Sequence, residues 1–210
     1  MKKTSRSQWV LGIDPGYGHT GAVLRRVDDP QPTAWACWSN DSTQEWPTLR
    51  AMSIAFPLIE TVIGWILEHQ IEDLDVCIEY PVYNRNARAL MTQMSLYDMI
   101  NAYCYDYLRP HLTRLWLTEV NPKTSKSKLA HDGQATKAMM IAASPWAKYK
   151  DFGLTLVQAH TLADSYAHSL SAEVREHRLH AMDQYAVSPT TVFPVGMCHH
   201  DEDPSDNGAE

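Results

Sequence analysis

The sequence predicts an α/β fold: a mixed five-stranded sheet, with three antiparallel strands followed by parallel ones, flanked by helices. Two patterns in the 210 residues lead to this prediction. Near the N-terminus, three short apolar segments are separated by turns, as in an antiparallel meander. After residue 50, helical and strand-like apolar periodicities alternate, which is typical of parallel strands joined by helical crossovers.

The first strand ends at an unusual residue. Trp9-Val10-Leu11-Gly12-Ile13 is a nearly continuous apolar run of the kind buried on both faces of a sheet. Asp14 follows it, and Pro15-Gly16-Tyr17-Gly18 has the composition of a turn, so a hairpin is expected here. The five strands are expected near residues 8–14, 21–27, 33–39, 74–80 and 114–120.

Four helices are expected between and after these strands. Residues 51–70 carry apolar residues at helical spacing, with a kink or a late start at Pro57. The others are expected at 87–108, at 134–144 before Pro145, and over the last long segment, 155–178.

A chain of 210 residues is long enough for one well-buried domain and short for two. We expect one domain over residues 1–180 and a loose acidic tail over 181–210. No apolar run reaches the roughly 18 residues of a membrane span, so no membrane partner is expected. The four cysteines are scattered and no signal-peptide core follows the basic N-terminus, which favours a cytoplasmic protein with reduced thiols.

The charge is distributed unevenly. The net charge of −7 is unfavourable for nucleic-acid binding, but the last ten residues alone hold five acids and no base. Residues 109–150 hold eight bases against two acids, a net charge of +6. Such a local basic surface is what binding to a phosphate backbone needs, although a solvated lysine face is an equally simple interpretation.

Two acidic residues stand at the ends of predicted buried strands. Asp14 ends the first strand, and Glu79 ends the strand "DVCIEY" just before Pro81. A parallel crossover would place these strands side by side, so the two carboxylates can converge at one end of the sheet. A buried carboxylate needs a partner, which could be the backbone N–H groups of a turn or a metal ion.

The last helix supplies further candidates. His160 and Asp164 are four residues apart and therefore share a helical face, about 5–6 Å apart at Cβ. Thr161 stands three residues before Asp164 and is a poor metal ligand. Taken alone, Asp14 could cap a turn, Glu79 could be a surface acid and His160 could be a core histidine.

Four segments together resemble the RuvC-type Holliday junction resolvases, within the RNase H-like superfamily. "GIDPGYGHTG" resembles their first-strand signature, and "CIEYPVYNRNARAL" resembles their second acidic motif. "VNPKTSKSKLAHDGQATKAMMI" and "HTLADSYAHSL" resemble their basic segment and their final helix. The similarity spans about residues 8–172 in the same order, and any one segment alone would be weak.

The resemblance implies an RNase H-like fold and a crossover junction endodeoxyribonuclease acting on four-way or branched DNA. It implies that Asp14, Glu79, His160 and Asp164 bind two Mg²⁺ ions, which Mn²⁺ could replace. The products would be a 5′ phosphate and a 3′ hydroxyl. The four-residue spacing of His160 and Asp164 resembles that of mitochondrial and phage-type members. The tryptophan-rich sequence with an acidic tail suggests a phage member, hence the host cytoplasm if phage-encoded. The four-residue spacing leaves two roles for His160, as a direct ligand or as a residue acting through water.

The basic segment is expected to bind DNA. Lys123, Lys126 and Lys128 are expected just before a helix whose start is marked by Gly133, and Lys137 one turn into it. Backbone N–H groups and the helix dipole at such a start suit a phosphate.

The segment after Glu79 is expected to reach the junction. Tyr83, Arg85 and Arg88 lie where the family has a loop that approaches the junction centre, and Tyr83 could stack on an unpaired base. The helix that follows corresponds to the family's dimer face, and a homodimer suits two symmetric nicks. Its apolar residues exceed a single core-facing stripe: Met91, Met94, Leu96, Tyr97, Ile100 and Tyr103.

Three alternatives remain open at this point. "DPGYGHTG" is loosely similar to the phosphate loop of actin-like ATPases and sugar kinases, but the duplicated domain and glycine-rich adenosine loop of those proteins are not visible. A non-catalytic junction-binding protein could keep the same fold. A nuclease for RNA–DNA hybrids, flaps or other branched DNA would share the metal site, because substrate choice depends on loops and dimer geometry.

Overall fold

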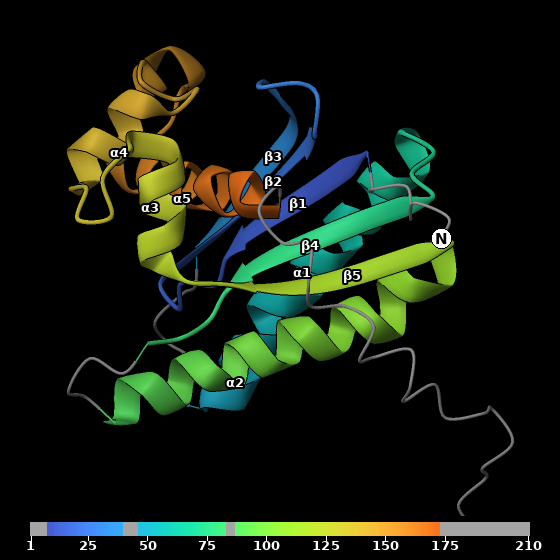
Figure 1. Cartoon of the computed structure of the whole chain (residues 1–210). Helices are drawn as coiled ribbons and strands as arrows, with labels where there is room; N and C mark the ends of the chain where they lie inside the picture. The colour runs from blue at the N-terminus through green and yellow to red at the C-terminus, as the bar shows by residue number, and fades with distance from the viewer. Residues whose placement is uncertain (1–7, 40–45, 83–86, 173–210) are drawn as a thin grey trace, which may run out of the picture. The chain divides into compact units, whose positions relative to one another are not determined.

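A computed structural model describes residues 8–39, 46–82 and 87–172 (Figure 1). The chain divides into two compact units, Met1–Glu176 and His177–Glu210, and the described residues all belong to the first. The predicted acidic tail, residues 181–210, therefore lies outside the described residues, and the domain boundary at residue 180 stays a prediction.

The described part contains the predicted mixed five-stranded sheet. Its order is β3-β2-β1-β4-β5, with β1–β2 and β2–β3 antiparallel and β1–β4 and β4–β5 parallel. The strands are β1 (Trp9–Asp14), β2 (His19–Arg26), β3 (Pro32–Ser39), β4 (Asp73–Glu79) and β5 (Arg114–Val120). The predicted fold class is confirmed, and each strand lies within about two residues of its expected position.

The helices differ more from expectation. They are α1 (Pro47–Glu68), α2 (Ala87–Tyr103), α3 (Pro122–Ala130), α4 (Lys137–Ala143) and α5 (Leu156–Ser171). A π-helical turn at Cys104–Leu108 and a 3₁₀ turn at Arg109–His111 continue α2, and a further 3₁₀ turn spans Tyr149–Phe152. The predicted 87–108 helix is thus α2 with its π-helical extension, and residues 173–178 of the predicted last helix lie outside the described residues.

The helices depart from expectation at two places: α1 has no late start at Pro57, and α3 was not expected. Helix α1 begins at Pro47 and continues through Pro57. An internal proline costs about 3 kcal/mol, which burial of a whole apolar helix face can outweigh. Helix α3 was not predicted, because the nine residues "PKTSKSKLA" bury only Ser125 and Leu129. The Asn121 side chain caps this helix by accepting a hydrogen bond from the Lys123 amide at 2.9 Å.

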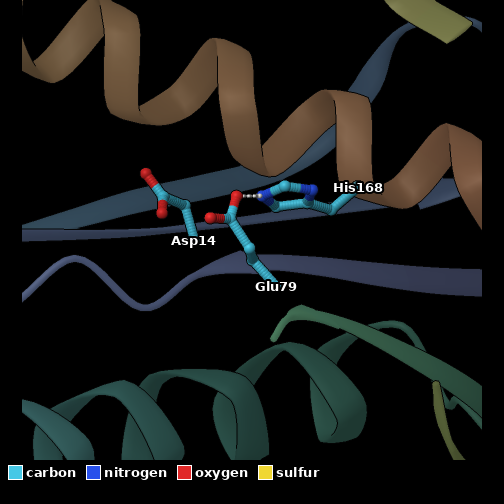
Figure 2. Close-up of side chains that lie close together, drawn as sticks. All are labelled: Asp14, Glu79 and His168. Atoms are coloured by element: carbon cyan, nitrogen blue, oxygen red, sulfur yellow. Dashed lines mark ion pairs between the residues drawn. The ribbon is translucent and has the colours of Figure 1, made fainter. Parts of the chain in front are cut away.

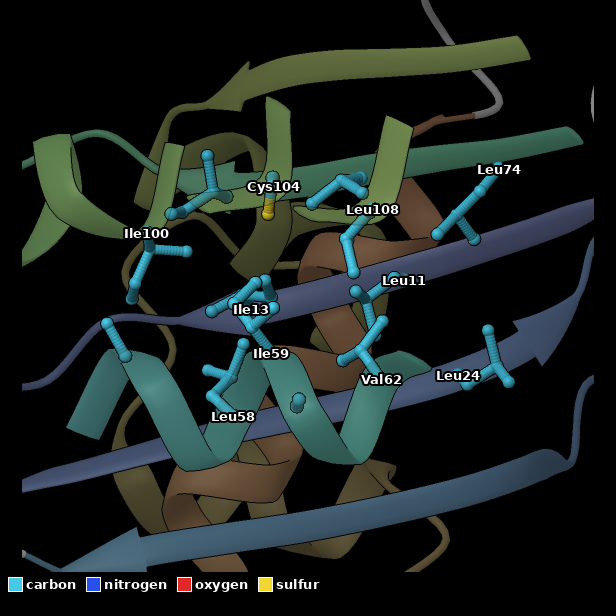
Figure 3. Close-up of a cluster of buried hydrophobic side chains, with 14 of the residues drawn as sticks. Leu11, Ile13, Leu24, Leu58, Ile59, Val62, Leu74, Ile100, Cys104 and Leu108 are labelled. Atoms are coloured by element: carbon cyan, nitrogen blue, oxygen red, sulfur yellow. The ribbon is translucent and has the colours of Figure 1, made fainter. Parts of the chain in front are cut away.

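Strand alternation assigns the two faces of the sheet to different helices (Figure 1). Leu11 and Ile13 of β1 and Val76 of β4 face α1 and α2, where they form the larger core together with Leu58 and Ile100 (Figure 3). The residues between them point to the opposite face, which α5 covers. There Val23 of β2 packs with a second core from α4 and α5: Met140, Ile141, Ala159, Leu162, Ala163 and Ala167.

Helix α1 is long and apolar enough to cross a membrane, by length and composition alone. The same test is passed by helices that pack in the core of a protein. Here one face of α1 is buried against the sheet, through Ala51, Ile54, Ala55, Leu58, Ile59, Val62 and Ile66. The outer face of its first turns exposes Leu49, Met52 and Phe56.

Helix α5 lies unusually close to the sheet because β1 and β2 present glycines to it. A Cβ atom at Gly12 would lie 1.9 Å from the Ser165 carbonyl oxygen and 2.7 Å from the Ser169 amide. A Cβ atom at Gly21 would lie 2.6 Å from Ser165 Oγ. The absence of these two side chains therefore lets the backbone of α5 pack directly on the sheet.

We predict that Gly12→Ala destabilises the protein by about 3 kcal/mol or more, because the clash is with helix backbone that cannot rotate away. Gly64→Ala in α1 is the matched control, since nothing lies within 4 Å of its Cβ position. The control substitution should raise the free energy of unfolding by about 0.5–1 kcal/mol, because alanine has a higher helix propensity than glycine. Urea unfolding of both variants, followed by circular dichroism, measures the difference. A Gly12→Ala protein as stable as the wild type would contradict the close approach of α5.

Candidate active site

Asp14 and Glu79 end adjacent parallel strands. Ile13 of β1 pairs with Ile78 of β4, so the next residue of each strand is a carboxylate at the same edge of the sheet. Because Leu11 and Ile13 face α1, alternation turns Asp14 toward α5. Val76 and Ile78 of β4 also belong to the core on the α1 side of the sheet, so the same alternation turns Glu79 toward α5.

Helix α5 brings polar side chains over this edge. Its N-cap is Thr155, whose hydroxyl accepts a hydrogen bond from the Gln158 amide in a capping box. His160 and Asp164 lie on one face of the helix, as predicted, and their side chains pair with 3.1 Å between Nε2 and Oδ2. Thr161, the position three residues before Asp164, is buried against Gly21 instead.

Among the described residues, a group of three possible metal ligands lies together and shares two members, Asp14 and Glu79, with the predicted set. Ligand atoms of Asp14, Glu79 and His168 all lie within 4.8 Å of one another (Figure 2). His160 and Asp164 are outside this group, although Asp164 interacts electrostatically with Asp14 and Glu79. The structure thus brings Asp14 and Glu79 together, places Asp164 near them, and holds His160 against Asp164.

Sequence analysis missed His168. A pattern in the sequence could have indicated it: His160, Asp164 and His168 follow one another at intervals of four residues and therefore share one helical face. Its side chain is only 2% exposed, and its Nε2 lies 3.2 Å from Glu79 Oε2. On the other side of the ring, Nδ1 lies 2.8 Å from Ser125 Oγ of α3.

The carboxylates raise one another's proton affinity. Loss of water raises the pKa of Asp14 well above its usual value, and the charges of Asp164 and Glu79 raise it further, against a smaller effect of Lys137. Loss of water also raises the pKa of Asp164, with His160 opposing. Burial lowers the pKa of His160 despite its contact with Asp164. A site whose carboxylates bind protons because they are buried and lie close together is also suited to a divalent cation.

The basic residues are placed differently from expectation. Lys123, Lys126 and Lys128 precede the expected helix but lie within a helix of their own, α3, because Asn121 and Pro122 already start a helix there. The other helix begins at Lys137 after its cap, Thr136, so Lys137 is at its first residue. The positive charges of Lys126 and Lys137 act on groups of the site.

Two of the loop residues expected to contact DNA, Tyr83 and Arg85, lie outside the described residues. Arg88 belongs to α2, but its side chain is likewise outside the described part. These three contacts stay predictions.

Most of the apolar residues assigned to a dimer face of α2 belong to the core. Leu96, Tyr97 and Ile100 are buried, and Met94 and Tyr103 pack against them. Only Met91 of that set is exposed, at 71%. The excess of apolar residues arises because α2 contacts both α1 and the sheet, and it does not by itself indicate a partner.

The donor set fits a divalent cation. Asp14 and Glu79 offer hard oxygen ligands, and Asp164 carries a third carboxylate next to them. His168 Nε2 is buried without a hydrogen-bond partner among the described residues, since its contact with Glu79 lacks hydrogen-bond geometry. A buried polar atom facing two carboxylates is satisfied by a bound ion.

Without metal, the raised pKa of Asp14 makes the folded state bind more protons than the unfolded state. Stability should therefore fall as pH rises from the ordinary carboxyl range through the raised pKa. We predict that Asp14→Asn is more stable than the wild type at pH 7 in EDTA, and that this advantage disappears toward pH 4. Thermal unfolding across this pH range measures both effects.

The control for this comparison is Asp28→Asn. Arg26 lowers the pKa of the exposed Asp28 carboxyl through a hydrogen bond, so this substitution should not stabilise the protein at pH 7. Added Mn²⁺ should then stabilise the wild type more than Asp14→Asn. An Asp14→Asn protein less stable than the wild type in EDTA would show that Asp14 is not electrostatically crowded.

Comparison with known proteins supports the fold assignment. No known family profile matches the sequence, and no curated protein matches it. Among solved structures, Thermus thermophilus RuvC aligns with a TM-score of 0.53 and 19% identity, over 79% of this chain and 95% of that one. T. thermophilus RuvC in complex with a Holliday junction substrate aligns with a TM-score of 0.54 and 17% identity, over 78% and 91% of the two chains.

A third solved structure extends the comparison beyond bacteria. The yeast mitochondrial Holliday junction resolvase Ydc2 aligns with a TM-score of 0.53 and 14% identity, over 81% of this chain and 80% of that one. At these identities the likeness concerns the fold. The β3-β2-β1-β4-β5 sheet and its flanking helices therefore constitute a RuvC-type fold.

Proposed function

We propose that this protein is a divalent-metal-dependent endonuclease that resolves four-way DNA junctions by paired nicks. The observation that carries the proposal is the meeting of Asp14 and Glu79, at the ends of two adjacent strands, with polar side chains of α5. It is strengthened by a fold similar to that of two proteins named as acting on Holliday junctions.

The residues suited to hold the ions are Asp14, Glu79 and Asp164, with His160 positioned by its contact with Asp164. When bound, two ions such as Mg²⁺ or Mn²⁺ supply an activated water and stabilise charge on the leaving 3′ oxygen. This chemistry gives 5′-phosphate and 3′-hydroxyl ends.

The lysines of α3 and α4 are suited to hold the phosphate backbone beside the acids. Lys126 and Lys137 already act electrostatically on Asp164, His160 and Asp14. A positive charge beside the site lowers the repulsion between the three carboxylates and the approaching phosphate. Lys123 and Lys128, which are exposed on α3, would extend the contact along the DNA.

A homodimer would place two copies of this site on one junction, as two nicks on opposing strands require. Exposed apolar side chains on α1, on the residue that caps it and on α2 support such an interface: Leu49, Met52, Phe56, Trp46 and Met91. We further propose that the protein works in the cytoplasm, of the host cell if it is encoded by a phage, where its cysteines are reduced.

The test uses a synthetic four-way junction and a matching linear duplex, each labelled on one strand at a time, with Mg²⁺ or with EDTA. We expect Mg²⁺-dependent nicks at symmetric positions on opposing strands of the junction and an intact duplex. Glu79→Gln should lose at least about 10³-fold in cleavage, because an ion contributes several kcal/mol to the transition state. It should bind the junction as tightly as the wild type, since removing a negative charge does not weaken phosphate contacts.

Other outcomes would assign a different activity. Tight junction binding without cleavage in Mg²⁺ or Mn²⁺ would indicate a non-catalytic junction-binding protein. Equal cleavage of flaps or RNA–DNA hybrids would indicate a nuclease for another substrate. An active Glu79→Gln protein would contradict the proposed mechanism.

We also predict that Lys137→Gln weakens junction binding and reduces the slope of log K against log[salt] by about one. Lys150→Gln is the control, because Lys150 carries the same charge and is exposed on the 3₁₀ turn Tyr149–Phe152, whereas it is Lys137 that acts on Asp14 and His160. Fluorescence anisotropy of a labelled junction between 50 and 300 mM salt, in Ca²⁺ or EDTA, measures both slopes. Identical slopes for the two variants would contradict a phosphate contact at Lys137.

A further inference from the structure

His168 occupies a position that the proposed carboxylate site does not explain. It lies one helical turn beyond Asp164 on α5, and its ring points toward the carboxylate of Glu79 (Figure 2). The side chain is 2% exposed, and its nearest ligand atom lies within 4.8 Å of those of Asp14 and Glu79. A histidine so placed either completes the packing under α5 or binds what the carboxylates bind.

The Nε2 atom favours the second role. It is fully buried and makes no hydrogen bond among the described residues, even though Glu79 Oε2 is 3.2 Å away. A buried polar atom left without a hydrogen bond typically costs about 1–3 kcal/mol. An ion held between the imidazole and the two carboxylates would remove this cost.

The opposite side of the ring is fixed by α3. Ser125 is 1% exposed, and its Oγ lies 2.8 Å from His168 Nδ1. The Ser125 hydroxyl hydrogen has two other acceptors, the Asn121 carbonyl at 3.4 Å and Ser171 Oγ at 3.3 Å. Ser171 is free to accept, because its own hydrogen is donated to the Ala167 carbonyl at 3.2 Å.

This network permits the tautomer that a ligand needs. With its hydrogen given to Asn121 or Ser171, Ser125 Oγ accepts a hydrogen bond from Nδ1–H of His168. The lone pair of the imidazole then stands on Nε2 and faces Asp14 and Glu79. Metal-binding histidines are commonly oriented in this way, by a hydrogen bond from the ring nitrogen that does not bind the metal.

We propose that His168 is a direct ligand of a divalent ion through Nε2, held in the required tautomer by Ser125. Mg²⁺ takes oxygen ligands, whereas imidazole nitrogen is a better donor to transition ions. The site would therefore bind Mn²⁺ in preference to Mg²⁺. This inference rests on the metal site of the proposed function, but it does not depend on cleavage of DNA.

The test is pulsed electron paramagnetic resonance on the full-length protein with one equivalent of Mn²⁺. Coordinated imidazole gives a ¹⁴N modulation of the Mn²⁺ echo, which becomes a ¹⁵N pattern in protein grown with ¹⁵N-histidine. We expect this modulation in the wild type and in His160→Gln, the control at the other histidine of α5. We expect its loss in His168→Gln.

Metal affinity gives a second readout that a purely structural role would not produce. In His168→Gln, the Kd for Mn²⁺ should rise at least about tenfold, and the Kd for Mg²⁺ should change less. A variant that is merely misfolded would lose both ions and would melt early in circular dichroism. In that case the His160→Gln spectrum still separates the two histidines of α5, because a retained nitrogen signal excludes His160 as its source.

Two failures can be told apart. Mn²⁺ bound without nitrogen modulation in the wild type, or modulation lost in His160→Gln, would overturn the role of His168 and leave the nuclease proposal standing. A wild type that binds neither Mn²⁺ nor Mg²⁺ would overturn both.

Discussion

The close packing of α5 on β1 and β2 is the constraint on which the rest of the structure depends. Gly12 and Gly21 leave no room for a Cβ atom beneath Ser165 and Ser169, so the helix backbone rests on the sheet. This contact sets how far the side chains of α5 stand above the strand ends. Asp164 and His168 reach Asp14 and Glu79 only because the helix is this close. Two residues without side chains therefore determine the geometry of the site.

The same packing explains why the site is electrostatically unfavourable without a cation. Covering the strand ends with a helix removes water from Asp14 and Asp164 and raises the pKa of both. The protein keeps these buried carboxylates at the end of the sheet, although uncharged residues there would make the folded state more stable. The positive charges of Lys126 and Lys137 reduce this repulsion: Lys137 lowers the pKa of Asp14 and Lys126 lowers that of Asp164. Sites that store such repulsion are commonly functional ones.

The strands and two carboxylates could be predicted because their signals are local. An acid directly after an apolar run, as at Asp14, is visible in the sequence itself, and parallel pairing then places Glu79 beside it. Helix α3 could not be predicted in this way, since its buried face is only Ser125 and Leu129. His168 was missed because a histidine on an apolar helix is usually a core residue. Its role depends on Ser125, 43 residues earlier in the chain, and no local pattern reports that contact.

The central claim is that α5 and the ends of β1 and β4 form one cation site. Crystals grown with Mn²⁺ and measured at a wavelength where manganese scatters anomalously would test it most directly. We expect an anomalous peak in contact with the carboxylates of Asp14 and Glu79, beneath His168. A peak only at other surface acids, or an ordered water in place of an ion between Asp14 and Glu79, would contradict it.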